Sequence, residues 1–325
     1  MTQLQSMLRS ARLLAGVFLA LTGLSGCALL APQTSALGDA WPAGLLERVE
    51  LSQVPFFPQQ DYQCGPAALA TTIAAFNGQV TPELLVPQVY LPARQGSLQV
   101  EMLAAPRRYD MVSYQLAPSY ADLLREVAAG TPVIVLQDYG VWPVPIWHYA
   151  VVVGYDYPKG ELVLRSGEKR RQVMPLSVLE YTWKNSKYWA MVSLPPDAIP
   201  VTATEADYLA AEVAMGRVGS AQAATTAFTT FLGRWPHNLT AQIGLANGHH
   251  ALGDLERAEA VLREAVQRHP QSVAVINNLA QTVSDQGRDD EALLLIEAAA
   301  LAEGPYALAA RETRDLIRKR LERKR

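Results

Sequence analysis

Short apolar runs separated by turn residues make up much of the chain before residue 200. Apolar runs bounded by turn signals are typical of buried strands, whereas runs with helical spacing that end at Gly or Asn-Gly are typical of helices. A strand, a turn at residues 156–160 and a second strand predict a β-hairpin. A helix followed by a mostly antiparallel sheet indicates an α+β domain. The predicted helices are residues 65–76 and 120–129, and the predicted strands are residues 132–136, 148–155, 161–165 and 189–194.

A period of 34 residues governs the chain after a Pro-rich linker at residues 195–204. It predicts three helix-turn-helix repeats at about 204–236, 238–270 and 272–304, which resemble tetratricopeptide repeats. Each repeat buries its apolar face only against a neighbour, and small residues let paired helices approach closely. The matched positions are Pro236 with Pro270, Leu245 with Leu279, Gly253 with Gly287, Ala258 with Ala292, Leu262 with Ile296, and Ala265 with Ala299.

Residues 306–325 have apolar positions on one helical face and are predicted to form a basic capping helix over the last repeat. Its Lys and Arg residues are interpreted as a solvated face. A role in contacting a membrane surface or a partner is the alternative.

The first 26 residues have the pattern of a secretory signal peptide. Arg9 and Arg12 precede a short apolar run that ends in Leu24-Ser25-Gly26-Cys27. This run is too short for a membrane-spanning helix, which needs about 20 apolar residues. The ending resembles the bacterial lipobox, which implies that Cys27 is lipidated and becomes the mature N-terminus. An ordinary signal peptide with an incidental cysteine is the alternative.

The residue after Cys27 is Ala28, not the Asp that retains such lipoproteins in the inner membrane of many Gram-negative bacteria. The resemblance therefore implies sorting to the periplasmic face of the outer membrane if the source is Gram-negative. Residues 27–50 show no sustained period and are predicted to form a tether.

Charge and cysteine content exclude some classes of protein. The net charge of -3 argues against a general nucleic-acid binder, which needs a basic surface to displace counterions. Two cysteines, Cys27 and Cys64, are too few for a disulfide framework. A length of 325 residues allows two or three domains, each with its own core.

Cys64 lies where a loop meets the predicted helix at residues 65–76. Gly65 gives the backbone room, and Pro66 suits the first turn of a helix. A thiol at this end of a helix lies at the positive pole of the helix dipole, which favours the thiolate. Reactive cysteines in such settings reach pKa values of about 3.5–7.5. A buried structural cysteine is the alternative.

His148 is the single histidine before residue 200 and begins a predicted strand. Nucleophilic cysteine chemistry needs a base that is distant in sequence and adjacent in space, so Cys64 and His148 form a candidate pair. One cysteine and one histidine fall short of the four ligands of a zinc site. No metal or cofactor is therefore expected.

Two motifs together resemble the bacteriocin-processing, double-glycine type of papain-like cysteine peptidase, over about residues 51–194. The resemblance implies that Cys64 is the nucleophile and that His148 first deprotonates it and then protonates the leaving amine. It also implies that Gln59 helps the Cys64 backbone N–H to hold the oxyanion. The motifs are Gln59-(four residues)-Cys64-Gly65-Pro66-Ala67-Ala68 and, about eighty residues later, His148-Tyr149-Ala150-Val151-Val152-Val153-Gly154-Tyr155-Asp156; Gln60 and Gln63 are alternative oxyanion donors.

The chain departs from that family where an Asp or Asn on the next strand orients the imidazole. The corresponding residues 162–168 are Leu-Val-Leu-Arg-Ser-Gly-Glu. The site is therefore a Cys–His dyad, or Ser166 or Glu168 takes the place of the acid, or catalysis is weak. The transporters that carry this peptidase also have membrane spans and an ATPase that this sequence does not show, so removal of leader peptides during export is not implied.

The sequence predicts a lipid-anchored extracytoplasmic cysteine peptidase whose helical repeats recruit a substrate or a partner protein. A cell-wall amidase or acyl transferase with the same Cys–His pair is one alternative, and a non-catalytic lipoprotein scaffold is another. The predicted fold class is an α+β papain-like domain followed by an all-α tetratricopeptide-repeat array. The predicted segments are a signal peptide (1–26), a lipid-anchored tether (27–50), the peptidase domain (51–197), the repeats (198–305) and the capping helix (306–325).

Overall fold

The computed structural model describes residues 31–59, 62–76 and 79–324. The predicted signal peptide, Cys27, Gln60 and the Asn77-Gly78 helix stop lie outside the described residues. The chain divides into two compact units. The sheet unit holds the described residues up to Met102 together with Gln115–Val192 and Pro200–Thr202, and the helical unit holds Leu103–Tyr114, Ser193–Ile199 and Ala203 onward.

No helix in the described part of the chain is long and apolar enough to cross a membrane.

One sheet organises the sheet unit. In the described residues it has seven strands in the order β2-β7-β3-β4-β5-β6, with β1 paired to β4 as well. The strand pairs β1–β4, β3–β4, β3–β7, β4–β5 and β5–β6 are antiparallel, as expected from the hairpin pattern. The strands are β1 (Arg48–Glu50), β2 (Val112–Gln115), β3 (Val133–Asp138), β4 (Trp147–Asp156), β5 (Glu161–Ser166), β6 (Lys169–Pro175) and β7 (Ala190–Leu194).

The four predicted strands are confirmed as β3, β4, β5 and β7. Strands β1, β2 and β6 were not predicted, and β6 has an exposed stretch of Lys and Arg residues without apolar alternation. Charged residues on such an edge strand prevent pairing with another chain. The predicted α+β arrangement is confirmed.

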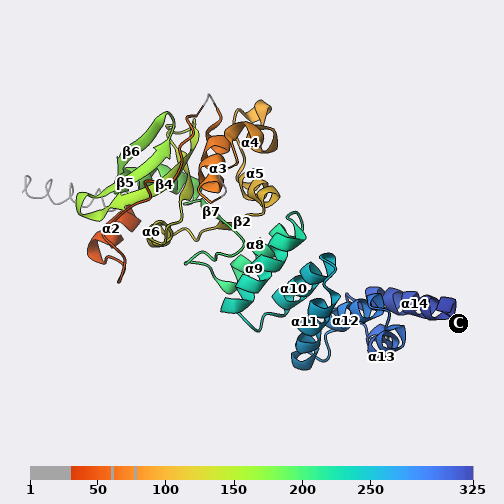
Figure 1. The fold of residues 1–325 in the computed structure, drawn as a ribbon. Coiled ribbons are helices and arrows are strands. Elements are labelled where there is room, and N and C mark those ends of the chain that lie inside the picture. The colour runs from red at the N-terminus through yellow and green to blue at the C-terminus, as the bar shows by residue number, and fades with distance from the viewer. Residues whose placement is uncertain (1–30, 60–61, 77–78, 325) are drawn as a thin grey trace, which may run out of the picture. The chain divides into compact units, whose positions relative to one another are not determined.

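Helix α3 packs on β4 and is buried from Gly65 to Ile73. Its Ala, Gly and Thr residues are small, so the helix axis can lie close to the sheet. Figure 1 shows α3, α4 and α5 grouped beside the sheet. The α-helices that precede β7 are α2 (Pro32–Asp39), α3 (Cys64–Ala74), α4 (Pro82–Val89), α5 (Gln99–Ala104), α6 (Tyr120–Ala128) and α7 (Leu176–Trp183), with short 3₁₀ turns η1 (Pro92–Arg94), η2 (Ala105–Tyr109), η3 (Tyr157–Lys159) and η4 (Lys184–Ser186).

The segment predicted as a tether, residues 27–50, contains a helix in its described part. Residues Pro32–Asp39 form α2, and its first N–H groups are capped by a side chain from another helix. The backbone N–H groups of Gln33 and Thr34 donate to the carboxylate of Glu180 on α7, at 2.8 and 2.6 Å. A carboxylate stabilises a helix N-terminus by satisfying its free N–H groups. A long-range interaction therefore orders a segment that has no helical pattern of its own.

The helical unit consists of paired helices that match the predicted repeats. Close approach between neighbouring helices requires a glycine: a Cβ at Gly244 would lie 2.5 Å from the ring of Phe228. Gly253 and Gly287 have φ values of 77° and 84° and end α10 and α12 in the left-handed conformation that favours glycine. The helices are α8 (Glu205–Gly216), α9 (Ala221–Arg234), α10 (Leu239–Ala251), α11 (Leu255–Arg268), α12 (Val273–Asp285), α13 (Asp289–Ala300) and α14 (Ala307–Lys324).

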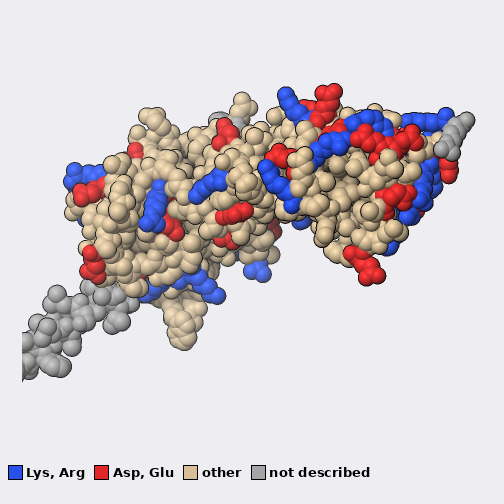
Figure 2. Space-filling view, turned by 90° about the horizontal axis from the view of Figure 1, so that it is seen from below, with Lys and Arg blue, Asp and Glu red and all other residues tan. Residues whose placement is uncertain are grey.

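Helix α14 covers the last repeat, as predicted, with Ile317 buried in the core of the repeats. Its basic face is less free than predicted, because Arg320 lies 2.8 Å from Asp285 and Lys324 lies 2.6 Å from Asp289. Figure 2 shows the mixed Lys, Arg, Asp and Glu surface over this part of the chain. The basic residues of α14 therefore hold the cap on α12 and α13.

The contact between Glu180 and α2 is the basis of a first prediction. Glu180→Ala removes the acceptor of four hydrogen bonds, from the backbone N–H groups of Gln33 and Thr34 and from the hydroxyls of Thr34 and Tyr188. We expect the free energy of unfolding to fall by about 3 kcal/mol, since hydrogen bonds to a buried carboxylate contribute about 1.5–3 kcal/mol each and are not additive. Limited proteolysis should cut within residues 32–39 in this variant.

The control for this prediction is Glu47→Ala, because the Glu47 side chain is exposed. Equal resistance to proteolysis in both variants would show that Glu180 does not hold α2.

Candidate active site

Cys64 is the first residue of α3, at the loop-to-helix junction that the sequence predicts. The following glycine is required by close packing, because a Cβ at Gly65 would lie 2.3 Å from the hydroxyl oxygen of Ser97. Pro66 lies in the first turn, where no intrahelical N–H is needed. The Cys-Gly-Pro sequence thus fixes the position of the thiol at the start of a buried helix.

The Cys64 thiol is partly buried, and it is a free cysteine. Burial raises the pKa of the thiol, while hydrogen bonds with the backbone of Tyr149, Gly65 and Cys64 itself lower it and offset part of this effect. The lowered pKa expected from the helix N-terminus is therefore not found, because desolvation outweighs the backbone N–H groups. In this structure the thiol form is favoured at neutral pH.

His148 is the second residue of β4 and pairs across the sheet with Gln137 on β3. Burial lowers the pKa of His148 to about 4, so the imidazole is neutral at pH 7. The ring of Tyr139 stacks on the imidazole with the ring centres 5.3 Å apart. Cys64 and His148 are thus both neutral. The thiol at the start of α3 lies near the start of β4, because it interacts with the backbone of Tyr149, the residue after His148.

Ser166, one of the two candidates for the missing acid, lies beside His148. Its hydroxyl oxygen is 2.9 Å from Nε2 of His148, and the residue is 5% exposed. Glu168 is exposed in the turn between β5 and β6. The separation arises because β5 ends at Ser166 and the chain turns at Gly167, which has a φ of 59°.

Gln59 lies near the start of β4. Its side-chain amide donates to the carbonyl oxygen of Tyr149 at 3.4 Å, and its backbone N–H donates to the carbonyl oxygen of Gly167 at 3.1 Å. Gln59 and Cys64 therefore both meet the backbone of Tyr149. Of the alternative donors, Gln63 is the residue before α3 and makes no side-chain cap, and Gln60 lies outside the described residues.

A group of polar side chains behind His148 was missed by the sequence analysis. Tyr139 donates to Gln137 at 3.1 Å, and Gln137 donates to Thr182 at 2.8 Å. Burial raises the pKa of Tyr139, and its interactions with Ser166 and Gln137 lower it and offset part of this effect. Gln137 is fully buried, and its polar side chain at the end of an apolar strand is the signal that could have revealed the group.

The loop between β3 and β4 forms an apolar rim next to the site. Residues 139–147 carry no charge, and Trp142 at the tip is 95% exposed. Exposed apolar side chains of this kind mark surfaces that contact another molecule. The other exposed apolar residues here are Val141, Val144 and Ile146 of the loop and Trp147, the first residue of β4.

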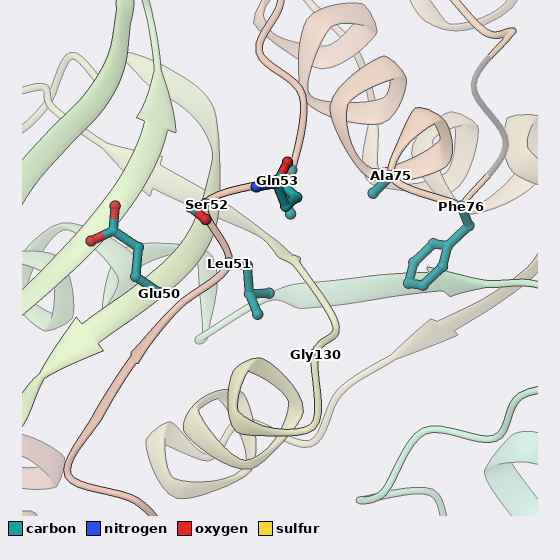
Figure 3. Close-up of a pocket in the computed structure, with 8 residues that line it drawn as sticks. Glu50, Leu51, Ser52, Gln53, Ala75, Phe76 and Gly130 are labelled. Atoms are coloured by element: carbon teal, nitrogen blue, oxygen red, sulfur yellow. The ribbon is translucent and has the colours of Figure 1, made fainter.

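A shallow depression of about 300 Å³ lies elsewhere in the sheet unit, lined by residues that include Leu51, Phe76 and Gly130. Figure 3 shows these residues around the C-terminal end of α3, whereas Cys64 begins that helix. The depression is therefore not part of the Cys64 site. Within the described residues no group of three or more His, Cys, Asp or Glu side chains is suited to hold a metal ion.

Comparison with known families agrees with the two resemblances. Residues 51–191 match the model of the Peptidase_C39 like family, and residues 239–282 match the tetratricopeptide repeat. These matches confirm that the first segment is similar to C39 peptidases and that the helical array contains tetratricopeptide repeats. No curated protein matches the chain.

Solved structures with similarity to the chain include three peptidase domains. A C39-like peptidase from Bacillus anthracis has 17% identity over 45% of this chain and 97% of that one, with a TM-score of 0.39. The double glycine motif protease of an AMS/PCAT transporter, in complex with a leader peptide, has 18% identity over 44% and 91%, with a TM-score of 0.33. The peptidase domain of Streptococcus ComA, a bifunctional ABC transporter of a quorum-sensing pathway, has 20% identity over 44% and 98%, with a TM-score of 0.35.

The low pKa of His148 makes stability depend on pH. The folded chain binds this proton less tightly than the unfolded chain, because the folded pKa of about 4 lies below the ordinary value of 6.5. The contribution of His148 to the free energy of unfolding is therefore complete above pH 6.5. It is lost as the pH falls toward 4, because the unfolded chain binds the proton more readily. We expect a loss of about 1–3 kcal/mol in the free energy of unfolding over this range, measured by urea denaturation.

His148→Gln should flatten that dependence, because a neutral amide does not titrate. The exposed His237 provides the control, and His237→Gln should keep the slope of the parent. An unchanged slope in His148→Gln would contradict the assignment of the low pKa to burial of this ring.

Proposed function

We propose that the chain is a cysteine peptidase that hydrolyses an extracytoplasmic peptide or protein, with Cys64 as nucleophile and His148 as general base and acid. The observation that carries the proposal is the convergence of Cys64 and Gln59 on the backbone of Tyr149, directly beside His148. Gln59, Cys64 and His148 all lie inside the segment that matches the Peptidase_C39 like family, residues 51–191.

The neutral state of both groups suggests how the first step proceeds. The Cys64 sulfur attacks the carbonyl carbon while His148 takes the thiol proton, so charge separation occurs only as the new C–S bond forms. The carbonyl oxygen becomes an oxyanion, which the Cys64 backbone N–H and the Gln59 amide stabilise. The Gln59 side-chain NH₂ has two N–H groups, and its hydrogen bond to the Tyr149 carbonyl oxygen, at 3.4 Å, uses one of them, so the second can donate to the oxyanion.

The second half of the reaction regenerates the thiol. The C–N bond breaks as His148 gives its proton to the leaving amine, which leaves a thioester on Cys64. A water molecule then attacks the thioester while His148 removes a proton from the water. The C–S bond breaks, the proton returns to the sulfur, and the carboxylic acid product leaves.

The catalytic proposal predicts the behaviour of two variants. Cys64→Ala should abolish hydrolysis of a mixed peptide library by the purified full chain, and His148→Ala should lower turnover by at least about 10²-fold, in the range of general acid–base effects. Products are measured by mass spectrometry. The Cys64→Ala variant should also retain bound substrate, which identifies the substrate class. Normal turnover without the Cys64 sulfur would exclude this mechanism.

The same experiment separates the alternative functions. Release of fragments from purified muropeptides, with no cleavage of peptides from proteins, would favour a cell-wall amidase. No hydrolysis of either substrate together with a Cys64 thiol that does not react with iodoacetamide would favour a non-catalytic scaffold. The tetratricopeptide repeats support docking of a substrate or a partner protein in all three cases.

The N-terminus supports a further part of the proposal, namely anchoring through a lipid on Cys27. Because α2 begins at Pro32 and is held by Glu180, only residues 28–31 would connect the lipidated cysteine to the sheet unit. Four extended residues span at most about 14 Å. The α2 end of the sheet unit would then lie close to the membrane surface, at the periplasmic face of the outer membrane in a Gram-negative cell.

Lipid anchoring predicts that Cys27→Ser moves the protein from the membrane fraction to the soluble fraction. Each buried methylene of a lipid chain contributes about 0.8 kcal/mol, so several chains together give durable binding. Detergent partitioning of the parent and the variant measures this change, and Cys64→Ser serves as the control. A mature N-terminus at a residue other than Cys27, found by mass spectrometry, would contradict the proposal.

A further inference from the structure

The β3–β4 loop, residues 139–146, carries no charge and exposes several apolar side chains. Trp142 is 95% exposed, and Val141 beside it is 82% exposed. A side chain with so few protein neighbours lines no pocket, whereas binding pockets are concave. The loop is therefore a projecting apolar surface, and such surfaces mark contact with another protein or with a membrane.

The backbone of the β3–β4 loop has few N–H groups left for water to hydrate. Pro143 and Pro145 have no N–H group. A segment that enters a bilayer must satisfy its backbone polar groups internally, and this loop meets much of that requirement. Four further N–H groups donate within the loop or to Asp138 at its base: Tyr139 to the Ile146 carbonyl oxygen (2.9 Å), Gly140 to Asp138 (2.9 Å), Val144 to the Val141 carbonyl oxygen (2.8 Å) and Ile146 to Asp138 (2.9 Å).

The base of the loop and the start of α2 contact the same element. Asp138 accepts from the side-chain amide of Asn185 on η4 at 3.1 Å, and Gln33 on α2 donates to Glu180 on α7 at 2.8 Å. Helix α7 ends at Trp183 and continues directly into η4. Glu180 and Asn185 are therefore separated by on the order of 10 Å along the helix. The start of α2 thus lies on the side of the sheet unit that carries the loop.

Positive charge lies beside the base of the loop. Lys184 belongs to η4 and Lys187 follows it, while Asn185 between them contacts Asp138. Lys187 is exposed, and Nζ of Lys184 lies 4.5 Å from the centre of the Tyr181 ring. Basic and aromatic side chains next to an apolar surface are typical of proteins that bind the headgroup region of a bilayer.

We propose that the β3–β4 loop inserts Trp142 and its apolar neighbours into the surface of a lipid bilayer, with Lys184 and Lys187 at the headgroups. The loop is then a second point of attachment beside the lipid on Cys27. The inference rests on the proposed anchoring for its cellular setting, because the short segment between Cys27 and α2 keeps that end of the sheet unit near the membrane. Binding of the loop to a bilayer depends on the described residues alone.

Insertion of the loop also determines where the candidate active site lies. The ring of Tyr139, the first residue of the loop, stacks on His148 with the ring centres 5.3 Å apart. Docking through the loop therefore brings His148 to the bilayer surface. The proposed peptidase then acts on peptide segments that are held at that surface.

Vesicle binding by residues 27–325 with Cys27→Ser tests the proposal. This parent chain lacks the lipid and the apolar run of the signal peptide, and it contains every residue that the structure describes. The vesicles consist of phosphatidylcholine alone or with phosphatidylglycerol, and they are in excess because a single apolar insertion binds reversibly. We expect the parent chain to sediment with the mixed vesicles. Trp142→Ser should lower the partition coefficient at least about tenfold, because Trp buries a large apolar area.

Leu294→Ser is the control, because Leu294 on α13 is also a large apolar side chain and is 81% exposed. This variant should bind vesicles as the parent chain does. Lys184→Gln and Lys187→Gln should each weaken binding to the mixed vesicles about fivefold, with little effect on vesicles of phosphatidylcholine alone.

Fluorescence locates the loop in the bilayer. Lipids brominated on their acyl chains should quench Trp fluorescence in the parent chain, and most of this quenching should be lost in Trp142→Ser. Equal vesicle binding and equal quenching in the two chains would overturn the inference, and a raised KM for peptides in that case would assign the loop to the substrate. Neither measurement needs hydrolysis or a lipid on Cys27, so failure of the proposed function is separable from failure of this inference.

Discussion

The pairing of β4 with its neighbours is the constraint on which the site depends. His148 lies opposite Gln137 on β3, and β5 brings Ser166 to the same ring. Side chains alternate between the two faces of a strand, so a slip of one residue would move His148 to the other face. The same strand supplies the Tyr149 backbone that both Gln59 and Cys64 contact. The apolar core of β4, buried from Tyr149 to Tyr155, holds this register in place.

Burial gives the site an electrostatic character unlike that of a preformed ion pair. Desolvation raises the pKa of Cys64 and lowers that of His148, and both shifts favour the neutral forms. Nucleophile and base would then become charged only when a substrate carbonyl is present to accept the sulfur. A thiol held in this state is also less reactive toward solvent oxidants, because the thiolate is the reactive species.

The N-terminal segment shows how one buried side chain can organise a region remote in sequence. Glu180 caps α2 from a helix nearly 150 residues further along the chain. This contact turns a segment without helical periodicity into part of the sheet unit. In the helical unit, by contrast, contacts are mostly between neighbouring helices, so the order of the helices follows the repeat period in the sequence.

The sequence alone determined the strands of the central hairpin, helix α3 with Cys64 at its start, and the repeats, because apolar periodicity, turn residues and the 34-residue period are local or nearest-neighbour signals. It left open a Cys–His dyad or a third residue at Ser166 or Glu168, and the tertiary structure places Ser166 beside His148, whereas the turn at Gly167 carries Glu168 out to solvent. The hydrogen bonds among Tyr139, Gln137 and Thr182 and the ordering of α2 also came only from the fold. Both depend on polar side chains that find partners across the sheet or on another helix, and no period in the sequence encodes such pairings. The direction of the pKa shift at Cys64 was likewise set by the fold, because burial depends on everything packed around the helix and not on the helix N-terminus alone.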